Sequence, residues 1–243
     1  MSDLAVALVA EGPTDRIIVE AALGTLLECN FTLTLLQPDR PTSDGGFGEL
    51  GSGWGGVYRW CRQAAAMGTP LSENPSLTRY QMIIVHLDAD VAGKRYSGDG
   101  ITDQPKDDLP CEKPCPPASD TVQCLQQVIL GWLDAADLPQ RAVFCIPSKC
   151  TESWVAVALY SDSDPGVLEN LECNDRVAEY LAAKPTSERL VRMRKGRPKK
   201  NRRRYEERSR VFEHRWSLVE SKCPQARAFA DAVRAALAKH AAT

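Results

Sequence analysis

The sequence contains no apolar run that approaches the roughly 20 residues needed to cross a membrane as a helix. It also lacks the pattern G-x-x-x-x-G-K-[ST], which argues against NTP hydrolysis by a P-loop within this chain. No basic segment precedes the first apolar run, so we predict a buried strand there and not a signal peptide.

Cysteine is present in an odd number, nine, and no export signal accompanies it. This combination favours free thiols in a reducing, cytoplasmic compartment. Cys111 and Cys115 have a spacing compatible with zinc, but there is no second cysteine pair, and the nearest histidine in sequence is His86. We therefore favour free cysteines in the Pro-rich loop at about residues 93–118, and the sequence leaves open whether Cys111 and Cys115 bind zinc.

Charge is distributed unevenly, although the net charge is only −2. Residues 1–183 contain 12 Lys and Arg against 26 Asp and Glu, whereas residues 184–243 contain 18 against 6. Acidic clusters can hold cations and a basic segment can contact phosphates, so this asymmetry suggests two different surfaces.

The first 161 residues alternate strand and helix patterns, which is typical of an α/β protein with a parallel sheet. Short apolar runs predict strands at 4–10, 31–36, 82–87 and 142–146. Amphipathic segments predict helices at 14–28, 54–67, 119–136 and 151–159. The predicted fold class is thus α/β, with a Rossmann-like parallel sheet flanked by helices.

Beyond about residue 162 the strand patterns stop and a helical, basic C-terminal region is predicted. Its expected helices span 175–183, 186–195, 201–222 and 224–241. We accordingly divide the chain into a catalytic domain over residues 1–161 and a helical, basic region over residues 162–243.

Acidic residues follow several of the predicted strands. Glu11 follows the first strand, Asp88 and Asp90 close the strongest later strand, and Glu152 follows another. Ligands of open parallel sheets bind at the carboxyl ends of strands, so these side chains should converge. Side chains alternate along a strand, so Asp88 and Asp90 should point the same way. Asp15, one helical turn past Glu11, could join them.

Carboxylates held close together repel unless a cation lies between them, and Mg²⁺ or Mn²⁺ with oxygen ligands is the natural partner. Each residue alone has a simpler explanation. Asp-x-Asp after a strand is common in α/β proteins, and Glu11 and Glu152 could be carboxylates at helix starts. Their joint arrangement favours the metal site.

Three segments resemble Toprim domains. Residues 8–15 read LVAEGPTD, similar to the strand and EG-x-(T/S)-(D/E) opening of that family. Residues 84–90 read IVHLDAD, similar to its D-x-D strand. Residues 145–154 read CIPSKCTESW, which resembles the P…E-x-W element of small stand-alone Toprim-like proteins and OLD-type nucleases. The resemblance covers about residues 4–160.

The resemblance implies roles for five carboxylates. Glu11 would be a metal ligand or general acid/base, and Asp88 and Asp90 would bind the metal. Asp15 and Glu152 would complete a second metal position, as in OLD-type nucleases. Two such ions, roughly 4 Å apart, would stabilise the attacking water and the leaving oxygen of a phosphodiester.

The implied activity is a nuclease that cleaves DNA or RNA, because no topoisomerase or primase accessory domain is present. The chain is too short to include the ATPase half of an OLD nuclease, so a separate ABC- or AAA-type ATPase subunit is an expected partner. A role in prokaryotic anti-phage defence follows from the resemblance alone. Ser148 and Lys149 would lie close enough to touch the scissile phosphate. A homo-oligomer is compatible with the sequence.

A basic stretch, Arg189 to Arg210, contains twelve Lys and Arg and two acids. Its simplest use is to neutralise nucleic-acid phosphates; pairing with the acidic body and a solvated face are the alternatives. One of these cations could also reach into the active site, but the sequence does not single one out. The expected nucleic-acid contacts are Lys149, Lys195, Lys199, Lys200, Arg202, Arg203 and Arg204.

Two other functions remain open at this stage. A non-catalytic subunit that binds nucleic acid or a partner could retain the acidic cluster as a relic. A receiver-like phosphoacceptor is weaker, because a lone central Asp and a matching Lys strand are missing. Residues 51–56 match G-x-G-x-x-G, but no strand directly precedes them, so dinucleotide binding is disfavoured.

Overall fold

The computed structural model describes residues 3–39, 48–104, 106–109, 112–164 and 170–241. Its centre is a four-stranded sheet with the order β2-β1-β3-β4, and all neighbouring strands are parallel. The strands are β1 (Leu4–Val9), β2 (Phe31–Gln37), β3 (Met82–His86) and β4 (Ala142–Cys145). The predicted fold class is confirmed.

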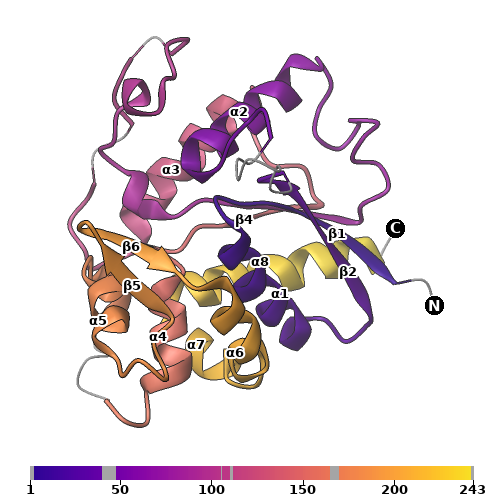
Figure 1. The fold of residues 1–243 in the computed structure, drawn as a ribbon. Coiled ribbons are helices and arrows are strands. Elements are labelled where there is room, and N and C mark those ends of the chain that lie inside the picture. The colour runs from indigo at the N-terminus through magenta and orange to yellow at the C-terminus, as the bar shows by residue number, and fades with distance from the viewer. Residues whose placement is uncertain (1–2, 40–47, 105, 110–111, 165–169, 242–243) are drawn as a thin grey trace.

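Helices cover both faces of this sheet (Figure 1). One face carries α2 (Gly53–Ala66) and α3 (Ser119–Trp132). The other carries α1 (Pro13–Leu26), α4 (Glu152–Tyr160), α5 (Val177–Ala183), α6 (Arg202–His214), α7 (Trp216–Lys222) and α8 (Pro224–Ala241). Short 3-10 turns lie at Ala89–Val91, Tyr96–Asp99 and Leu171–Cys173. None of the described helices combines the length and apolar composition that a membrane span requires.

The sheet is apolar because both of its faces are covered. Every residue of β3 is buried, and β1 is buried except for partly exposed Ala5. Strands buried on both faces read as continuous apolar runs, which is why these two were visible in the sequence.

The order in which strands are added to the sheet reverses between β1 and β3. From β1 it crosses through α1 to β2 on one side, and from β2 it crosses through α2 to β3 on the other. In open α/β sheets, ligands bind at the carboxyl ends of the two strands that flank such a reversal. The topology therefore places the residues after β1 and β3 at the expected ligand position.

Residues 162–243 complete the core on one face of the sheet. Trp154 of α4 contacts Trp216 of α7 edge to face, with ring centroids 5.5 Å apart, and stacks on Phe229 of α8 at 6.3 Å. These rings belong to the same buried cluster as Val6 and Leu8 of β1. Apolar packing is thus continuous across the predicted boundary at residue 161.

The C-terminal region is mainly helical, as predicted, but two of its expected helices differ in the structure. Residues expected in a helix at 186–195 instead supply β5 (Val191–Arg194), which pairs antiparallel with β6 (Arg197–Lys200). The helix expected at 201–222 is interrupted at Arg215, between α6 and α7. The helices predicted at 175–183 and 224–241 are confirmed as α5 and α8.

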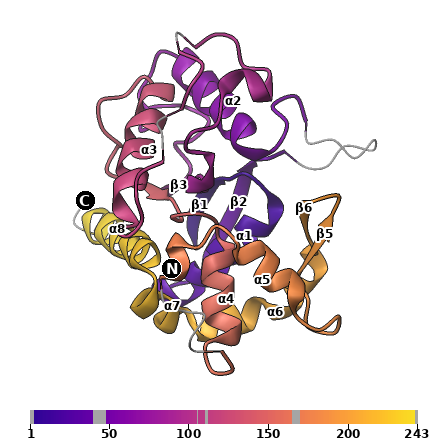
Figure 2. The ribbon, with the colours of Figure 1, turned by 90° about the vertical axis from the view of Figure 1, so that its left-hand side faces the viewer.

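Figure 2 shows the β5–β6 hairpin extending from the body of the molecule. It belongs to no larger sheet. Its turn consists of Lys195 and Gly196, both with positive φ, 50° and 73°. Two-residue turns of this kind match the natural twist of a hairpin, and glycine at the second position makes the conformation accessible.

Candidate active site

Glu11 and Asp88 meet at the reversal point of the sheet. Glu11 follows β1 by two residues and Asp88 follows β3 by two residues. The Glu11 carboxylate accepts a hydrogen bond of 2.7 Å from the backbone N–H of Asp88. The convergence predicted for these two residues is therefore present in the structure.

The backbone around these carboxylates is tied on both sides. The N–H of Gly53, the first residue of α2, donates to the Glu11 carbonyl at 2.8 Å. Across the site, Ala89 and Asp90 donate their N–H groups to the carbonyls of Pro147 and Lys149, at 2.9 and 3.0 Å. The loop 147–151 and the glycine-rich start of α2 thus hold the two segments in register.

Asp90 occupies a different position from the one predicted. Strand β3 ends at His86, so strand alternation does not reach Asp88 and Asp90, and Asp90 lies in a 3-10 turn. Its side chain is about half exposed and pairs with Lys94 at 3.2 Å. Asp88 is buried, and its Oδ1 accepts the N–H of Thr151 at 3.1 Å. The prediction that Asp88 and Asp90 point the same way because they share a strand is therefore wrong. Asp90 nevertheless lies near enough to Glu11 for its charge to act on that carboxylate.

A second carboxylate pair, Asp15 and Glu152, lies beside the first. Asp15 is buried in the first turn of α1, and Glu152 is buried at the first position of α4. The ammonium of Lys200 lies 3.2 Å from Asp15 Oδ1 and 2.9 Å from Glu152 Oε1. The predicted second metal position is thus occupied by a lysine of β6.

Two hydroxyl groups complete the hydrogen bonding of this pair. Thr151 Oγ1 donates to Asp15 Oδ1 at 2.9 Å. The hydroxyl of Tyr205 in α6, fully buried, donates to Glu152 Oε1 at 2.8 Å. Because Thr151 also contacts Asp88 through its N–H, it links the two carboxylate pairs.

Burial and crowding raise the pKa of the first pair. Burial first, and then the charges of Asp88 and Asp90, raise the pKa of Glu11 from its ordinary 4.5 to about 8. Burial also raises the pKa of Asp88 to about 6, although His86 opposes the shift. These carboxylates have more negative charge around them than nearby cations compensate, which is the electrostatic condition for binding a cation.

The second pair is electrostatically satisfied. Burial opposes ionisation of Asp15, but Lys200 holds its pKa below the usual value. Burial likewise opposes the charge on Lys200, yet Asp15 and Glu152 raise its pKa well above its ordinary value. Lys200 therefore bridges Asp15 and Glu152 in a buried ion triad.

His86 lies beneath the first pair. It is fully buried, and its Nε2 lies 3.4 Å from Asp88 Oδ1. Neither ring nitrogen makes a hydrogen bond to the residues that the structure describes. Burial alone would lower its pKa, but the carboxylates of Asp88 and Asp15 raise it to about 9. His86 is thus packed directly behind Asp88.

The carboxylates are not arranged as a ready-made metal cage. Within the described ranges, no three Asp, Glu, His or Cys side chains converge on a point where an ion could lie. Glu11 and Asp88 each accept a backbone N–H hydrogen bond with one carboxylate oxygen, and Asp90 forms an ion pair with Lys94. The donor chemistry, hard carboxylate oxygens, fits Mg²⁺ or Mn²⁺, but binding would require at least one of these side chains to rotate.

Most of the predicted phosphate-binding cations already have partners within the chain. Lys200 bridges Asp15 and Glu152, and Lys149 forms an ion pair with Glu112. The rest of the engaged set consists of Arg202 with Glu206, Arg203 with Glu207, and Arg204 with the carbonyls of Thr186 and Arg189. Intramolecular pairing, one of the alternatives for this stretch, therefore accounts for these cations, and two others, Lys195 and Lys199, remain exposed.

Sequence reasoning missed Lys200, Tyr205 and Thr151 as members of the site. Lys200 and Tyr205 lie almost 200 residues after Glu11, in a segment with no strand pattern. Thr151 adjoins Glu152 and could have been suspected from that position alone. No sequence signal distinguishes Lys200 from the eleven other cations of its stretch.

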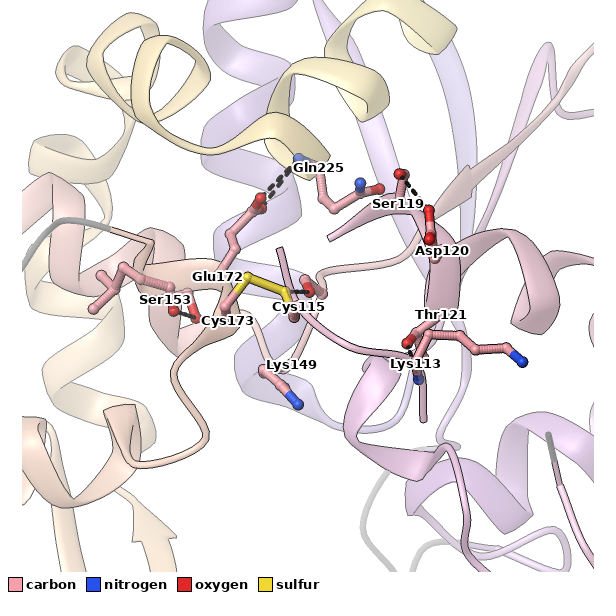
Figure 3. The surroundings of a disulfide bond; sticks show 12 residues. Lys113, Cys115, Ser119, Asp120, Thr121, Lys149, Ser153, Glu172, Cys173 and Gln225 are labelled. Carbon is pink, nitrogen blue, oxygen red and sulfur yellow. Dashed lines mark hydrogen bonds between the residues drawn. A yellow bond between two sulfur atoms is a disulfide. The ribbon is translucent and has the colours of Figure 1, made fainter. Parts of the chain in front are cut away.

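A disulfide lies at the rim of the site (Figure 3). Cys115 of the Pro-rich loop is bonded to Cys173, with the two Cα atoms 5.4 Å apart, and Cys115 Sγ lies 3.9 Å from Ser148 Oγ. The prediction of a free cysteine is therefore wrong for Cys115. The bond leaves no signal in the sequence because its two cysteines are 58 residues apart and only folding brings them together. Cys111 lies outside the described residues.

Cys173 itself is anchored to the fold. Its neighbour Glu172 is buried and accepts hydrogen bonds from Trp154 Nε1 and from the N–H of Gln225 at the start of α8, at 2.8 and 2.9 Å. The disulfide thus joins the Pro-rich loop to the packed C-terminal helices.

Comparison of the chain with protein-family models, curated proteins and solved structures found no match. The function of the chain is therefore inferred from the residues of the site.

Replacing Glu11 by Gln is expected to alter how stability depends on pH in the presence of chelator. The folded pKa of about 8 exceeds the ordinary 4.5, so the folded state retains a proton that the unfolded state has released. The contribution of Glu11 is therefore present below its unfolded pKa and lost as pH rises towards its folded pKa. Glutamine does not titrate, so the variant should lose less stability over that interval.

The measurement is the midpoint of thermal unfolding from about pH 5 to about pH 9. Glu73→Gln, at an exposed position far from the site, is the matched control and should follow the wild type. Parallel curves for wild type and Glu11→Gln would show that Glu11 is not crowded by negative charge.

Proposed function

We propose that this protein is a Mg²⁺- or Mn²⁺-dependent nuclease of Toprim type that cleaves nucleic-acid phosphodiesters. One observation carries the proposal: Glu11 and Asp88, from adjacent strands, meet at the reversal point of the sheet with pKa values raised to about 8 and about 6. Natural folds retain such crowded carboxylates mainly where a cation or a reaction requires them.

Glu11, Asp88 and Asp90 would hold the metal. A bound Mg²⁺ or Mn²⁺ supplies Lewis acidity towards a phosphoryl oxygen and lowers the pKa of bound water. The chain's own groups have separate tasks. His86 and Thr151 orient Asp88. Lys200 favours the ionised form of Asp15, pairs with Glu152, and places a fixed positive charge beside the metal ligands.

A second metal ion between Asp15 and Glu152 would require Lys200 to move. The proposal therefore differs from the two-ion arrangement that the family resemblance implies. A single metal ion and the ammonium of Lys200 together provide two positive charges. Both would stabilise the negative charge that accumulates on the phosphate oxygens in the transition state.

The wider setting also belongs to this proposal. An action in anti-phage defence, with a separate ATPase subunit as partner, is supported only by the resemblance of residues 8–15, 84–90 and 145–154 to OLD-type nucleases. The cytoplasm is the compartment in which nucleic acid would be accessible to such an enzyme.

The direct test is incubation of the purified chain with plasmid, single-stranded DNA and total tRNA, in Mn²⁺, in Mg²⁺ or in chelator. We expect cleavage of at least one substrate in the metal-containing samples and none in chelator. Cleavage that persists in chelator, or intact substrates throughout, would contradict the proposal.

A second candidate is a non-catalytic nucleic-acid-binding subunit. The observation that favours it is the Asp15–Lys200–Glu152 triad, which already neutralises part of the acidic cluster without a metal. It predicts nucleic-acid binding that is unchanged in Asp88→Asn and cleavage that is absent under every metal condition above.

A further inference from the structure

The β5–β6 hairpin presents two different faces. Its cross-strand pairs are Val191 with Lys200, Arg192 with Lys199, Met193 with Pro198, and Arg194 with Arg197. Side chains alternate between the two faces along each strand, and directly opposite residues share a face. One face therefore carries Val191, Met193, Pro198 and Lys200, and the other, here called the basic face, carries Arg192, Arg194, Arg197 and Lys199.

The face opposite the basic face is anchored to the protein. Val191 is fully buried and packs in the core with α5. Lys200 reaches the carboxylates of Asp15 and Glu152. These two residues form one cross-strand pair, so the base of the hairpin is fixed beside the candidate active site.

The basic face consists only of cations, and like charges oppose each other in both of its pairs. Arginine opposite lysine, and arginine opposite arginine, destabilise an antiparallel pair unless an anion lies between them. All four side chains are exposed, and none of them forms an ion pair or side-chain hydrogen bond with any residue in the described parts of the chain. Lys195 at the turn adds a fifth exposed cation.

Neighbouring arginines in the same basic stretch behave differently. Arg202 and Arg203 lie on α6 and pair with Glu206 and Glu207 one turn later, at 2.8 and 2.9 Å. Among the residues that the structure describes, acidic partners are thus present for the helix but not for the basic face. Repulsion among the cations of the basic face is therefore uncompensated in the free protein, and an anionic ligand that binds this face would relieve it.

We propose that the basic face binds the phosphate backbone of duplex DNA and tethers the DNA beside the carboxylate site. The inference rests on the proposed function and names its substrate class. A two-stranded β-ribbon fits the major groove of B-form DNA, about 12 Å wide, whereas the major groove of A-form RNA is too narrow for side chains to enter. The basic face carries no aromatic ring on which unpaired bases would stack, which argues against a single strand.

The hairpin lies between the proposed DNA and the carboxylate site. Lys199 faces outward to the DNA and Lys200 faces inward to Asp15 and Glu152. Because successive residues of a strand point to opposite faces, DNA held by Lys199 lies across the ribbon from these carboxylates, while Lys200 fixes the base of the hairpin beside them.

The experiment measures binding of the full chain to a short labelled duplex DNA by fluorescence anisotropy, in chelator so that no cleavage can occur. The hairpin variant combines Arg192→Gln, Arg194→Gln, Arg197→Gln and Lys199→Gln. The matched control removes four charges from α6 with Arg202→Gln, Arg203→Gln, Arg208→Gln and Arg210→Gln. Single-stranded DNA, duplex RNA and vesicles of anionic lipid are the competing probes.

We expect the hairpin variant to bind duplex DNA at least about 50-fold more weakly at 0.1 M salt, and its salt dependence to be shallower by about 3 to 4 in slope, because each lost phosphate contact contributes about 0.9. The control should lose less than about fivefold. The thermal midpoint of the hairpin variant should equal or exceed that of the wild type, since substitution removes repulsion between like charges.

Equal losses of DNA affinity in the two variants would overturn the inference, because they would show that binding depends on total positive charge and not on the basic face. It would also be overturned by a wild type that does not bind duplex DNA, or by a loss that is as large for single strands, duplex RNA or vesicles. Since binding is measured without metal, the two proposals fail separately. A wild type that binds through the hairpin but cuts nothing contradicts only the nuclease, and one that cuts DNA equally well without the basic face contradicts only the hairpin.

Discussion

Asp88→Asn is expected to reduce metal-dependent cleavage by a factor of at least about 100, the scale of losing one key electrostatic group in an active site. Asparagine has nearly the shape of aspartate and can still accept the N–H of Thr151, so the local fold should be preserved. The charge, however, is lost from the residue that contacts Glu11, His86 and Thr151 at once. The measurement is the initial rate of cleavage of the preferred substrate at several Mn²⁺ concentrations.

Asp137→Asn is the matched control for Asp88→Asn. Asp137 is exposed in the loop that leads into β4, at the amino end of the sheet and therefore at the edge opposite the site. Its variant should cleave at the wild-type rate. Equal rates for Asp88→Asn and wild type would show that Asp88 takes no part in the chemistry, whereas recovery of Asp88→Asn at high Mn²⁺ would identify a defect of metal affinity.

Lys200→Met is expected to lower the free energy of unfolding in chelator by about 3 kcal/mol, because it leaves two buried carboxylates without their cation. Asp15 and Glu152 are both at least 95 % buried, and Lys200 is the only cation that forms an ion pair with either within the described residues. Methionine has a similar length and no charge, so the loss reports on electrostatics more than on packing. Urea unfolding followed by circular dichroism gives the free energy.

Lys199→Met provides a close comparison, since it changes the same residue type on the same strand. Lys199 points away from the carboxylates, and its substitution should change stability by less than about 0.5 kcal/mol. Mn²⁺ should restore part of the stability of Lys200→Met, because a divalent ion can then enter between Asp15 and Glu152. Indistinguishable stabilities of the two variants would remove Lys200 from the account of the site.

The sheet and its acidic edge could be predicted from sequence because each leaves a local signal. Buried parallel strands such as β3 appear as apolar runs, and the residue that follows such a run lies at the carboxyl end of the sheet wherever the sheet goes. Glu11 and Asp88 were found by this rule. Asp90 shows its limit, since β3 ends at His86 and a 3-10 turn replaces the expected alternation.

The hairpin could not be predicted because its strands lack an apolar face. β5 and β6 read VRMR and RPKK, and only Val191 is buried among them. The signal that remained was the Lys195–Gly196 turn, which a run of charges obscures. Pairing in this region depends on tertiary anchors, namely Val191 in the core and Lys200 on two carboxylates more than 40 residues away.

The Lys200 triad and the Cys115–Cys173 bond share one reason for having been missed. Both join residues that are far apart in sequence, by 185 residues for Asp15 and Lys200 and by 58 for the cysteines. Neither pair has a spacing that distinguishes it from other lysines or cysteines of the chain. Contacts of this kind can be identified only once the fold is known.

The most direct measurement of the central claim is anomalous scattering from a crystal of the wild-type chain soaked in Mn²⁺. If carboxylates from β1 and β3 bind a divalent ion, an anomalous peak will lie roughly 2.0–2.4 Å from oxygens of Glu11 and Asp88. The same soak of Asp88→Asn should leave that position without a peak. A wild-type crystal with Mn²⁺ bound elsewhere only, and with the Glu11 carboxylate still on the Asp88 N–H, would contradict the account.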